Sequence, residues 1–264
     1  GGAVGAVGLP MVVAVCSARN APGATTLGLG LAALWPDEPQ AVLVECDPAG
    51  GDLASRFGHY PDPGLLSLAA AARSGPGGVD LAAHAQCLAV GAEVVLAPPG
   101  DSAAAGVATL AAGGPRVLRH LAADQTVIVD VGRIVRGGPG LALAGAADHV
   151  LVVCGADLPA QAQVAARLEW LRPAVAGRLW LVPTGGGYRS EEISRDLGVP
   201  VLGALPRGRL VSGALGGTLR VPNWSRLGLG RVIAQIAATL VTAQPALVVP
   251  QPHTPAPHRV EALT

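Results

Sequence analysis

Short, almost uninterrupted apolar runs recur along the chain, and longer segments with helical spacing separate them. The runs occupy residues 11–16, 41–46, 93–97, 126–131, 149–154, 178–182 and 200–205. Continuous runs of this length, rather than strict alternation of apolar and polar residues, are typical of strands that are buried on both faces of a parallel sheet. We therefore expect these runs to form a mostly parallel sheet.

Segments with helical periodicity lie between these runs. Asp157 can cap a helix over residues 157–171, and Ser190 is expected to cap a second helix over residues 189–197. The longest helical pattern covers residues 225–241. Because strands alternate with helices, we predict an α/β fold, with a doubly wound, mostly parallel sheet and helices on both faces.

The pattern indicates one domain, which we place at residues 11–243. We expect residues 1–10 to be a flexible N-terminus. They lack the charged and apolar segments of a signal peptide, so we do not predict one there. Residues 244–264 are rich in proline and are expected to form a disordered tail. No run of about 18 apolar residues occurs, so we predict no membrane span.

Composition narrows the class of protein further. Half of the residues are hydrophobic and only 3% are aromatic, so the core must be built mainly from Leu, Val and Ala. The 18 basic residues are all arginine and balance 18 acidic ones, which leaves no net field to attract nucleic acid. The four cysteines (Cys16, Cys46, Cys87 and Cys154) form no CxxC or zinc pattern, which favours buried thiols in a reducing cytoplasm.

The segment CSARNAPGATTLGLG, residues 16–30, joins the first apolar run to a helical pattern. Gly23 allows the backbone to approach a phosphate, and the N–H groups of residues 23–26 would point at it from the start of a helix. In such a loop Thr25 would bind Mg²⁺ and Thr26 a phosphate oxygen. The position that normally holds a lysine is Ala24, and a simple glycine-rich turn is the alternative interpretation.

Carboxylates follow two later apolar runs. Glu45 and Asp47 end the second run, and Asp130 ends the fourth. The carboxyl ends of parallel strands meet at one edge of the sheet, where α/β proteins bind ligands. Asp47 could therefore order a water or reach Mg²⁺, and Asp130 could hold Mg²⁺ through water. The alternative is that Asp47 caps a turn and Glu45 is a surface acid.

These motifs together resemble the ParA/MinD family of deviant P-loop ATPases over residues 12–241. SARNAPGATT is similar to the family's loop pattern K-G-G-x-G-K-T-T, VLVECDPAGGDL resembles its switch I region, and TVIVDVG resembles its switch II region. The segment EEISRDLGVPVLGALPRG resembles the closing strand of the family. In form, the loop is similar to that of the CpaE/TadZ branch.

The resemblance implies binding of ATP or ADP with Mg²⁺. The implied nucleotide-binding residues are Arg19, Asn20, Ala21, Pro22, Gly23, Ala24, Thr25 and Thr26. Thr25, Asp47 and Asp130 match the metal-binding positions, and Asp47 also matches the catalytic acid that orders water. Arg19 matches the signature lysine, which reaches the nucleotide of a partner subunit. Thr184 and Gly185 stand where the family often has an Asn-Arg pair near the base, which leaves the base preference open.

We therefore expect a homodimeric scaffold or positioning factor with weak or absent ATP hydrolysis. Its expected partners are proteins, including membrane-associated components of a pilus or secretion machinery, and it is expected to be cytoplasmic or recruited to the membrane by those partners. The alternatives are an active ATPase of chromosome or plasmid partition and a nucleotide-free interaction module. A cluster of arginines is interpreted as a solvated face rather than a basic patch for DNA or phospholipid: Arg207, Arg209, Arg220, Arg226 and Arg231.

Overall fold

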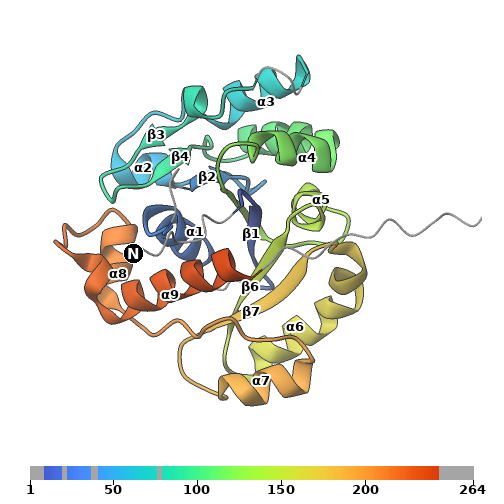
Figure 1. Ribbon diagram of the computed structural model, residues 1–264, viewed down its shortest axis with the longest axis vertical. Helices are drawn as coiled ribbons and strands as arrows, with labels where there is room; N and C mark the ends of the chain where they lie inside the picture. Colours follow the sequence, from blue (N-terminus) through green and yellow to red (C-terminus); the bar gives the residue numbers. More distant parts are fainter. Residues whose placement is uncertain (1–8, 20–22, 37–40, 76–78, 244–264) are drawn as a thin grey trace, which may run out of the picture.

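A computed structural model describes residues 9–19, 23–36, 41–75 and 79–243. In this part of the chain seven strands form one sheet in the order β3-β4-β2-β5-β1-β6-β7 (Figure 1). Their bounds are β1 Val12–Ser17, β2 Val42–Glu45, β3 Gln86–Cys87, β4 Glu93–Val95, β5 Val127–Arg133, β6 His149–Gly155 and β7 Arg178–Thr184. The neighbouring strands are parallel except for β3, which pairs antiparallel with β4. The prediction of a mostly parallel sheet is confirmed.

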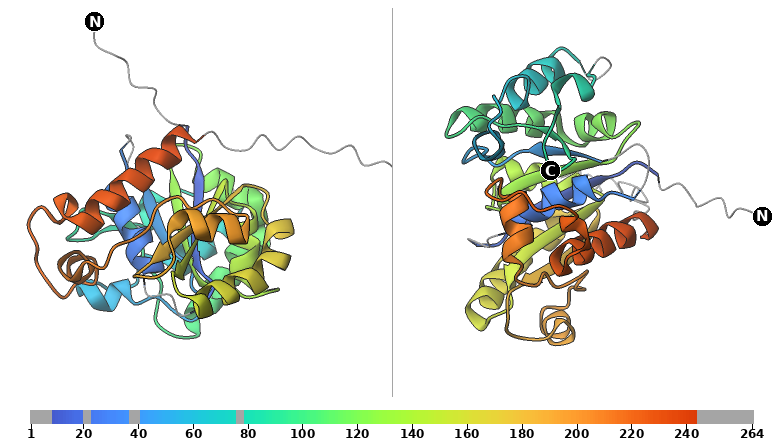
Figure 2. Two further views of the ribbon diagram at one scale, coloured as in Figure 1. Left: turned by 90° about the horizontal axis from the view of Figure 1, so that it is seen from below. Right: turned by 90° about the vertical axis from the view of Figure 1, so that its left-hand side faces the viewer.

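Helices cover both faces of the sheet (Figure 2). Residues of α1 (Ala24–Ala33), α2 (Leu53–Phe57), α8 (Arg209–Leu215) and α9 (Gly228–Thr242) pack into one hydrophobic core. The second core contains residues of α3 (Leu65–Arg73), α4 (Ser102–Leu121), α5 (Pro139–Gly145), α6 (Leu158–Leu171) and α7 (Ser190–Leu197). The described residues also contain three short 3-10 turns: η2 (Ala82–His84), η3 (Arg172–Ala174) and η4 (Trp224–Arg226).

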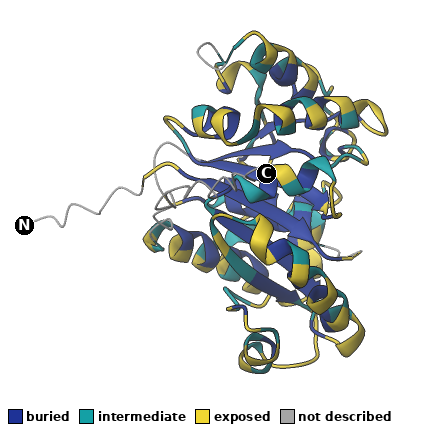
Figure 3. Cartoon of the chain, turned by 90° about the vertical axis from the view of Figure 1, so that its right-hand side faces the viewer, coloured by how far each residue is buried: buried dark blue, intermediate teal, exposed yellow. Residues whose placement is uncertain are grey.

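Successive residues of each central strand enter opposite cores, as side chains of a strand must. In β1, Val13 and Val15 belong to the core beneath α1, whereas Val12, Ala14 and Cys16 belong to the other core. The central strands are buried except at the ends of β5 and β6, where Arg133 is exposed and Gly155 is half-buried (Figure 3). The continuous apolar runs of the sequence therefore reflect a sheet with two covered faces.

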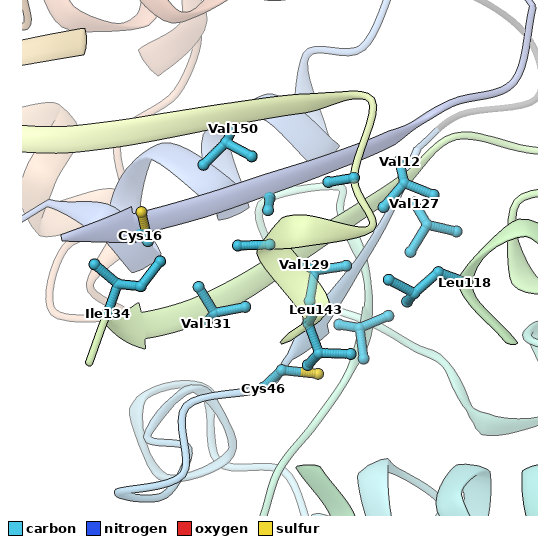
Figure 4. Close-up of a cluster of buried hydrophobic side chains, with 14 of the residues drawn as sticks. Val12, Cys16, Cys46, Leu118, Val127, Val129, Val131, Ile134, Leu143 and Val150 are labelled. Atoms are coloured by element: carbon cyan, nitrogen blue, oxygen red, sulfur yellow. The ribbon is translucent and has the colours of Figure 1, made fainter. Parts of the chain in front are cut away.

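Three cysteines follow the expectation of burial and one does not. Cys16, Cys46 and Cys154 are buried, and Figure 4 shows Cys16 and Cys46 among the aliphatic side chains of one core. Cys87 is exposed because it lies on β3, a two-residue strand at the edge of the sheet. The interpretation of Cys87 as a buried thiol was wrong.

Residues 200–205 do not form the strand that their apolar run predicted. They pass beside β7 and make only two isolated bridges to it, between Leu181 and Val201 and between Thr184 and Leu205. Gly203 packs closely against Ile236 of α9 instead of extending a ladder. The segment therefore covers the outer edge of β7 without becoming a regular strand.

Helix starts also differ in detail from the sequence prediction. Helix α6 is capped as expected, because the Asp157 Oδ1 accepts the Ala160 N–H at 2.9 Å. At α7, Ser190 is the first helical residue rather than the cap, and the Glu192 carboxylate accepts the backbone N–H of Arg189 at 2.8 Å. The pattern expected from residue 225 becomes a 3-10 turn followed by α9.

No helix in the described part of the chain is long and apolar enough to cross a membrane. The tail expected to be disordered, residues 244–264, lies outside the described residues. The same is true of residues 1–8 of the N-terminus that we expected to be flexible. The domain boundaries predicted from the sequence therefore stay predictions.

Candidate functional site

The glycine-rich loop joins β1 to α1, as predicted. Gly23 has a φ of 130°, a conformation that favours glycine, and it immediately precedes the helix. Its carbonyl accepts the N–H of Leu27 at 2.7 Å, so the helical hydrogen bonds begin at this residue. Of the predicted nucleotide-binding residues, Asn20, Ala21 and Pro22 lie outside the described part of the chain. The backbone N–H groups that follow Gly23 stand at a helix N-terminus, where an anion is stabilised.

A cavity of about 740 Å³ opens beside this loop. Arg19, Gly23 and Thr26 line it from the loop and the first turn of α1, while Gly155 and Thr184 line it from the ends of β6 and β7. Side chains of α8 and α9 complete the lining. The cavity thus lies at the carboxyl ends of the parallel strands, where open α/β sheets bind their ligands.

Two further arginines line the cavity, and sequence reasoning missed them. Arg207 and Arg209 precede and begin α8, and both belong to the cavity wall. Their interpretation as part of a solvated face was therefore incomplete, whereas Arg220, Arg226 and Arg231 are not among the lining residues. The apolar run 200–205 passes beside β7 and brings the residues after it to the carboxyl end of that strand, but no pattern in the sequence indicates this placement.

Among the predicted metal-binding residues, Asp130 lies close to both Thr25 and Asp47. It is 3% exposed, and burial raises its pKa to about 6, an effect that the Thr25 side chain and the Gly132 N–H partly offset by hydrogen bonding. The Gly132 N–H donates to Asp130 Oδ1 at 3.0 Å. The nearby charge of Asp47 raises the pKa further. The side chains of Thr25 and Asp130 therefore lie together, and their role in binding metal stays a prediction.

Asp47 lies against the backbone that follows Asp130. A Cβ added to Gly132, whose φ is 62°, would stand 2.0 Å from Asp47 Oδ2. Partial burial raises the pKa of Asp47, while the Ala49 N–H, which donates to Oδ1 at 2.8 Å, and the charge of Arg133 lower it. Asp47 therefore caps a turn, as the alternative interpretation proposed, and it also faces the end of β5. Its role toward water or Mg²⁺ stays a prediction.

Glu45 is not the surface acid that one interpretation proposed. It is 3% exposed, and its carboxylate accepts backbone N–H groups from Asp52 and Leu53 at 3.2 Å each and from Ala97 at 2.9 Å. Burial raises its pKa to about 7 even though these three donors lower it. Glu45 thus fastens the segment after β2 to the segment after β4.

The cavity and the acidic group form two adjoining parts of one site. Thr26 lines the cavity, whereas Thr25, Asp47 and Asp130 lie together beside it and do not line it. One hydroxyl and two carboxylates supply the oxygen ligands that Mg²⁺ prefers. In the described residues, no three His, Cys, Asp or Glu side chains are grouped to hold a metal by themselves. A cation here would need oxygen ligands from a nucleotide or water.

Ala24 occupies the position of the expected lysine. Its side chain is 7% exposed and belongs to the core that α1 covers. It contributes neither charge nor a hydrogen-bond donor to the cavity. Positive charge at this site comes instead from the backbone N–H groups of the helix start and from arginine side chains of other segments.

Comparison with solved structures identifies the fold. The chain superposes with a TM-score of 0.70 on a ParA family ATPase from Chlorobium tepidum TLS, at 16% identity, covering 88% of this chain and 99% of that one. The cell division ATPase MinD of Pyrococcus furiosus also gives a TM-score of 0.70 at 16% identity, over 89% of this chain and 99% of that one. This chain therefore has the ParA/MinD-like α/β fold.

A third structure was solved with a ligand. The septum site-determining protein MinD of Pyrococcus horikoshii OT3, complexed with Mg-ADP, gives a TM-score of 0.67 at 14% identity, over 87% of this chain and 95% of that one. No protein-family model matches the sequence, and no curated protein matches it. At these identities the likeness establishes the fold and leaves the function to be argued from the site.

Proposed function

We propose that this chain binds ATP or ADP with Mg²⁺ in the cavity beside α1 and acts as a ParA/MinD-like positioning scaffold. The observation that carries the proposal is the junction of three features at one edge of the sheet. These are the helix start at Gly23, the 740 Å³ cavity, and the group formed by Thr25, Asp47 and Asp130. Arg19, Gly23 and Thr26 line the phosphate end of the cavity, and Thr25, Asp47 and Asp130 are the residues that would hold Mg²⁺.

Ala24 is the reason for proposing weak or absent hydrolysis. A charge-assisted hydrogen bond contributes about 1.5–3 kcal/mol, so its absence weakens nucleotide binding about tenfold to over a hundredfold. Backbone N–H groups and a bound cation leave binding measurable. The chemical step suffers more, because a cation at this position acts most strongly on charge that develops in the transition state. Asp47 is the residue that would order the attacking water.

The biological role proposed for this scaffold is that of the CpaE/TadZ-like branch, on the strength of its loop. In this role a homodimer of the domain at 11–243 recruits protein partners, including membrane-associated components of a pilus or secretion machinery. The protein itself is cytoplasmic and reaches the membrane through those partners. The tail at 244–264 is proposed to be disordered and not to act as an anchor.

A working partition ATPase is the second candidate. The placement of Asp47 against Gly132 and of Thr25 against Asp130 favours it, because these groups keep the arrangement that a metal-dependent hydrolase needs. The third candidate, a nucleotide-free interaction module, differs from both in predicting no nucleotide binding. ATP turnover separates the first two candidates.

Calorimetric titration with ATP and ADP in the presence of Mg²⁺ tests the proposal. We expect weak binding that Thr25→Ala diminishes further. Thr109→Ala changes a half-buried threonine on α4 that does not line the cavity, and it should leave binding unchanged. Ala24→Lys should tighten binding or raise turnover. A melting curve must accompany this variant, since Ala24 is buried and the new amine has to reach out of the apolar layer.

Three results would contradict parts of this proposal. No heat at millimolar nucleotide, together with identical behaviour of Thr25→Ala, supports the nucleotide-free module. Rapid turnover by the natural protein that Asp47→Ala abolishes supports the partition ATPase. A folded Ala24→Lys protein with unchanged affinity and turnover shows that the missing lysine does not limit the site.

A further inference from the structure

The lining of the cavity carries positive charge away from the loop. Arg207 and Arg209 join Arg19, and Asp157 is the single carboxylate among the described lining residues. None of these arginines forms an ion pair with a described carboxylate. Asp157 already accepts the Ala160 N–H through Oδ1. The guanidinium groups are therefore available to a ligand.

Arg207 lies at the end of the cavity remote from the loop. Its Nη2 and Nε atoms are 3.7 and 3.8 Å from the point where a Cβ on Gly185 would stand. Gly185 follows β7, and β6 separates β7 from β1, so this point is about 10 Å, or two strand spacings, from the loop that follows β1. The Leu205 N–H donates to the Pro183 carbonyl at 2.8 Å and holds this segment against β7.

Near Gly185 the guanidinium of Arg207 offers a flat conjugated group. Among the described lining residues there is no aromatic ring, and Gly155 and Gly185 leave the wall without side chains. The guanidinium of Arg207 is planar and stacks on aromatic faces, whereas an ammonium group does not. Phosphates held at the helix start would direct the base of a nucleotide toward this opposite end.

We propose that Arg207 is the stacking platform for the nucleobase, and that the cavity consequently accepts adenine and guanine nucleotides with little distinction. This inference rests on the proposed nucleotide-binding function. A stack recognises the face of a base, which every base possesses, rather than its hydrogen-bonding edge. Thr184, which precedes Gly185, and Ser212 of α8 also line the cavity, and their hydroxyls can donate or accept, so they suit either purine.

Calorimetric titration of the full chain with Mg-ATP, Mg-GTP and Mg-tripolyphosphate tests this assignment. The natural protein should bind ATP and GTP with dissociation constants within about threefold of each other, because stacking discriminates little. Arg207→Ala should weaken both roughly tenfold and leave tripolyphosphate nearly unchanged. Arg207→Lys keeps the positive charge but lacks the planar guanidinium, so it should also weaken the binding of both nucleotides. Arg220→Ala, an exposed arginine outside the cavity, should change none of the three.

Each contrary result has a definite meaning. If the natural protein binds none of the three ligands, the proposed function and this inference fail together. If it binds nucleotides but Arg207→Lys equals the natural protein, charge rather than stacking holds the ligand and this inference alone fails. The same holds if ATP is preferred strongly over GTP, or if Arg207→Ala weakens tripolyphosphate as much as ATP.

Discussion

Glu45 is a buried carboxylate whose partners are backbone N–H groups rather than cations. Those donors come from Asp52, Leu53 and Ala97, so the side chain joins two loops at the edge of the candidate site. Its ordinary pKa of 4.5 rises to about 7 in the folded chain because burial opposes the charged form. Ionisation of Glu45 therefore weakens the fold although the ionised group has three donors.

The free energy of unfolding should fall as the pH rises from about 4.5 to about 7 in metal-free buffer. In this window the folded chain binds more protons than the unfolded chain, so raising the pH favours unfolding. Asp130 contributes in the same direction, from its ordinary 3.8 to about 6. Urea unfolding of Glu45→Gln over the same pH series should show a smaller slope, since glutamine cannot ionise.

The matched control for this series is Glu169→Gln, an exposed carboxylate on α6. Its slope should equal that of the natural protein. An unchanged slope in Glu45→Gln would show that other groups govern the pH dependence.

At the scale of elements, the end of β5 packs closely against the turn after β2, because Gly132 has no side chain where Asp47 lies. Gly132 combines a φ of 62° with the close approach of Asp47, so both its conformation and its lack of a side chain are required. Gly137 also has a positive φ, of 74°, but a Cβ there would meet nothing within 4 Å. Substitution at Gly137 therefore introduces backbone strain alone, whereas substitution at Gly132 introduces the same strain and also a clash with Asp47.

Gly132→Ala should destabilise the protein by at least about 1 kcal/mol more than Gly137→Ala, because only the first forces Asp47 away. Both variants bear the left-handed strain, which costs about 1–2 kcal/mol. Urea unfolding measures the difference. Equal losses in the two variants would mean that Asp47 moves aside without cost.

The sequence predicted the elements whose signals are local. Continuous apolar runs located β1, β2, β4, β5, β6 and β7, and the glycine before the paired threonines located the start of α1. The prediction of a strand at residues 200–205 was wrong, because an apolar run does not distinguish a paired strand from a segment that only passes beside one. The two-residue β3 carries no periodic signal. Arg207 and the burial of Glu45 depend on segments distant in sequence, and no local pattern reveals them.

At the scale of the whole molecule, the exposed Arg19 lies on the cavity wall. The family resemblance places a cation at this position on the nucleotide of a second subunit. A dimer built in this way includes each subunit's ligand in its interface. Arginine suits the contact because it binds phosphate with two donors and keeps its charge.

Dimerisation should therefore require nucleotide. Light scattering should show a monomer alone and a dimer with a slowly hydrolysed ATP analogue, and Arg19→Ala should abolish the dimer without lowering the melting temperature. Arg220→Ala, which lies outside the cavity lining, serves as the control. A dimer that forms equally well without nucleotide, or that survives Arg19→Ala, would leave Arg19 without a role across subunits.

Both margins of the sheet in the described part of the chain are poorly suited to further pairing. One ends in the two-residue antiparallel β3, and residues Val201 and Leu205 bridge to β7 at the other. Long, open margins invite a foreign strand to add to the sheet, which is a common route to both peptide recognition and aggregation. Because neither margin of the described sheet offers a long strand as a template, we expect a partner to recognise side chains on helices and loops. For the same reason we do not expect copies of the chain to associate by joining sheet to sheet.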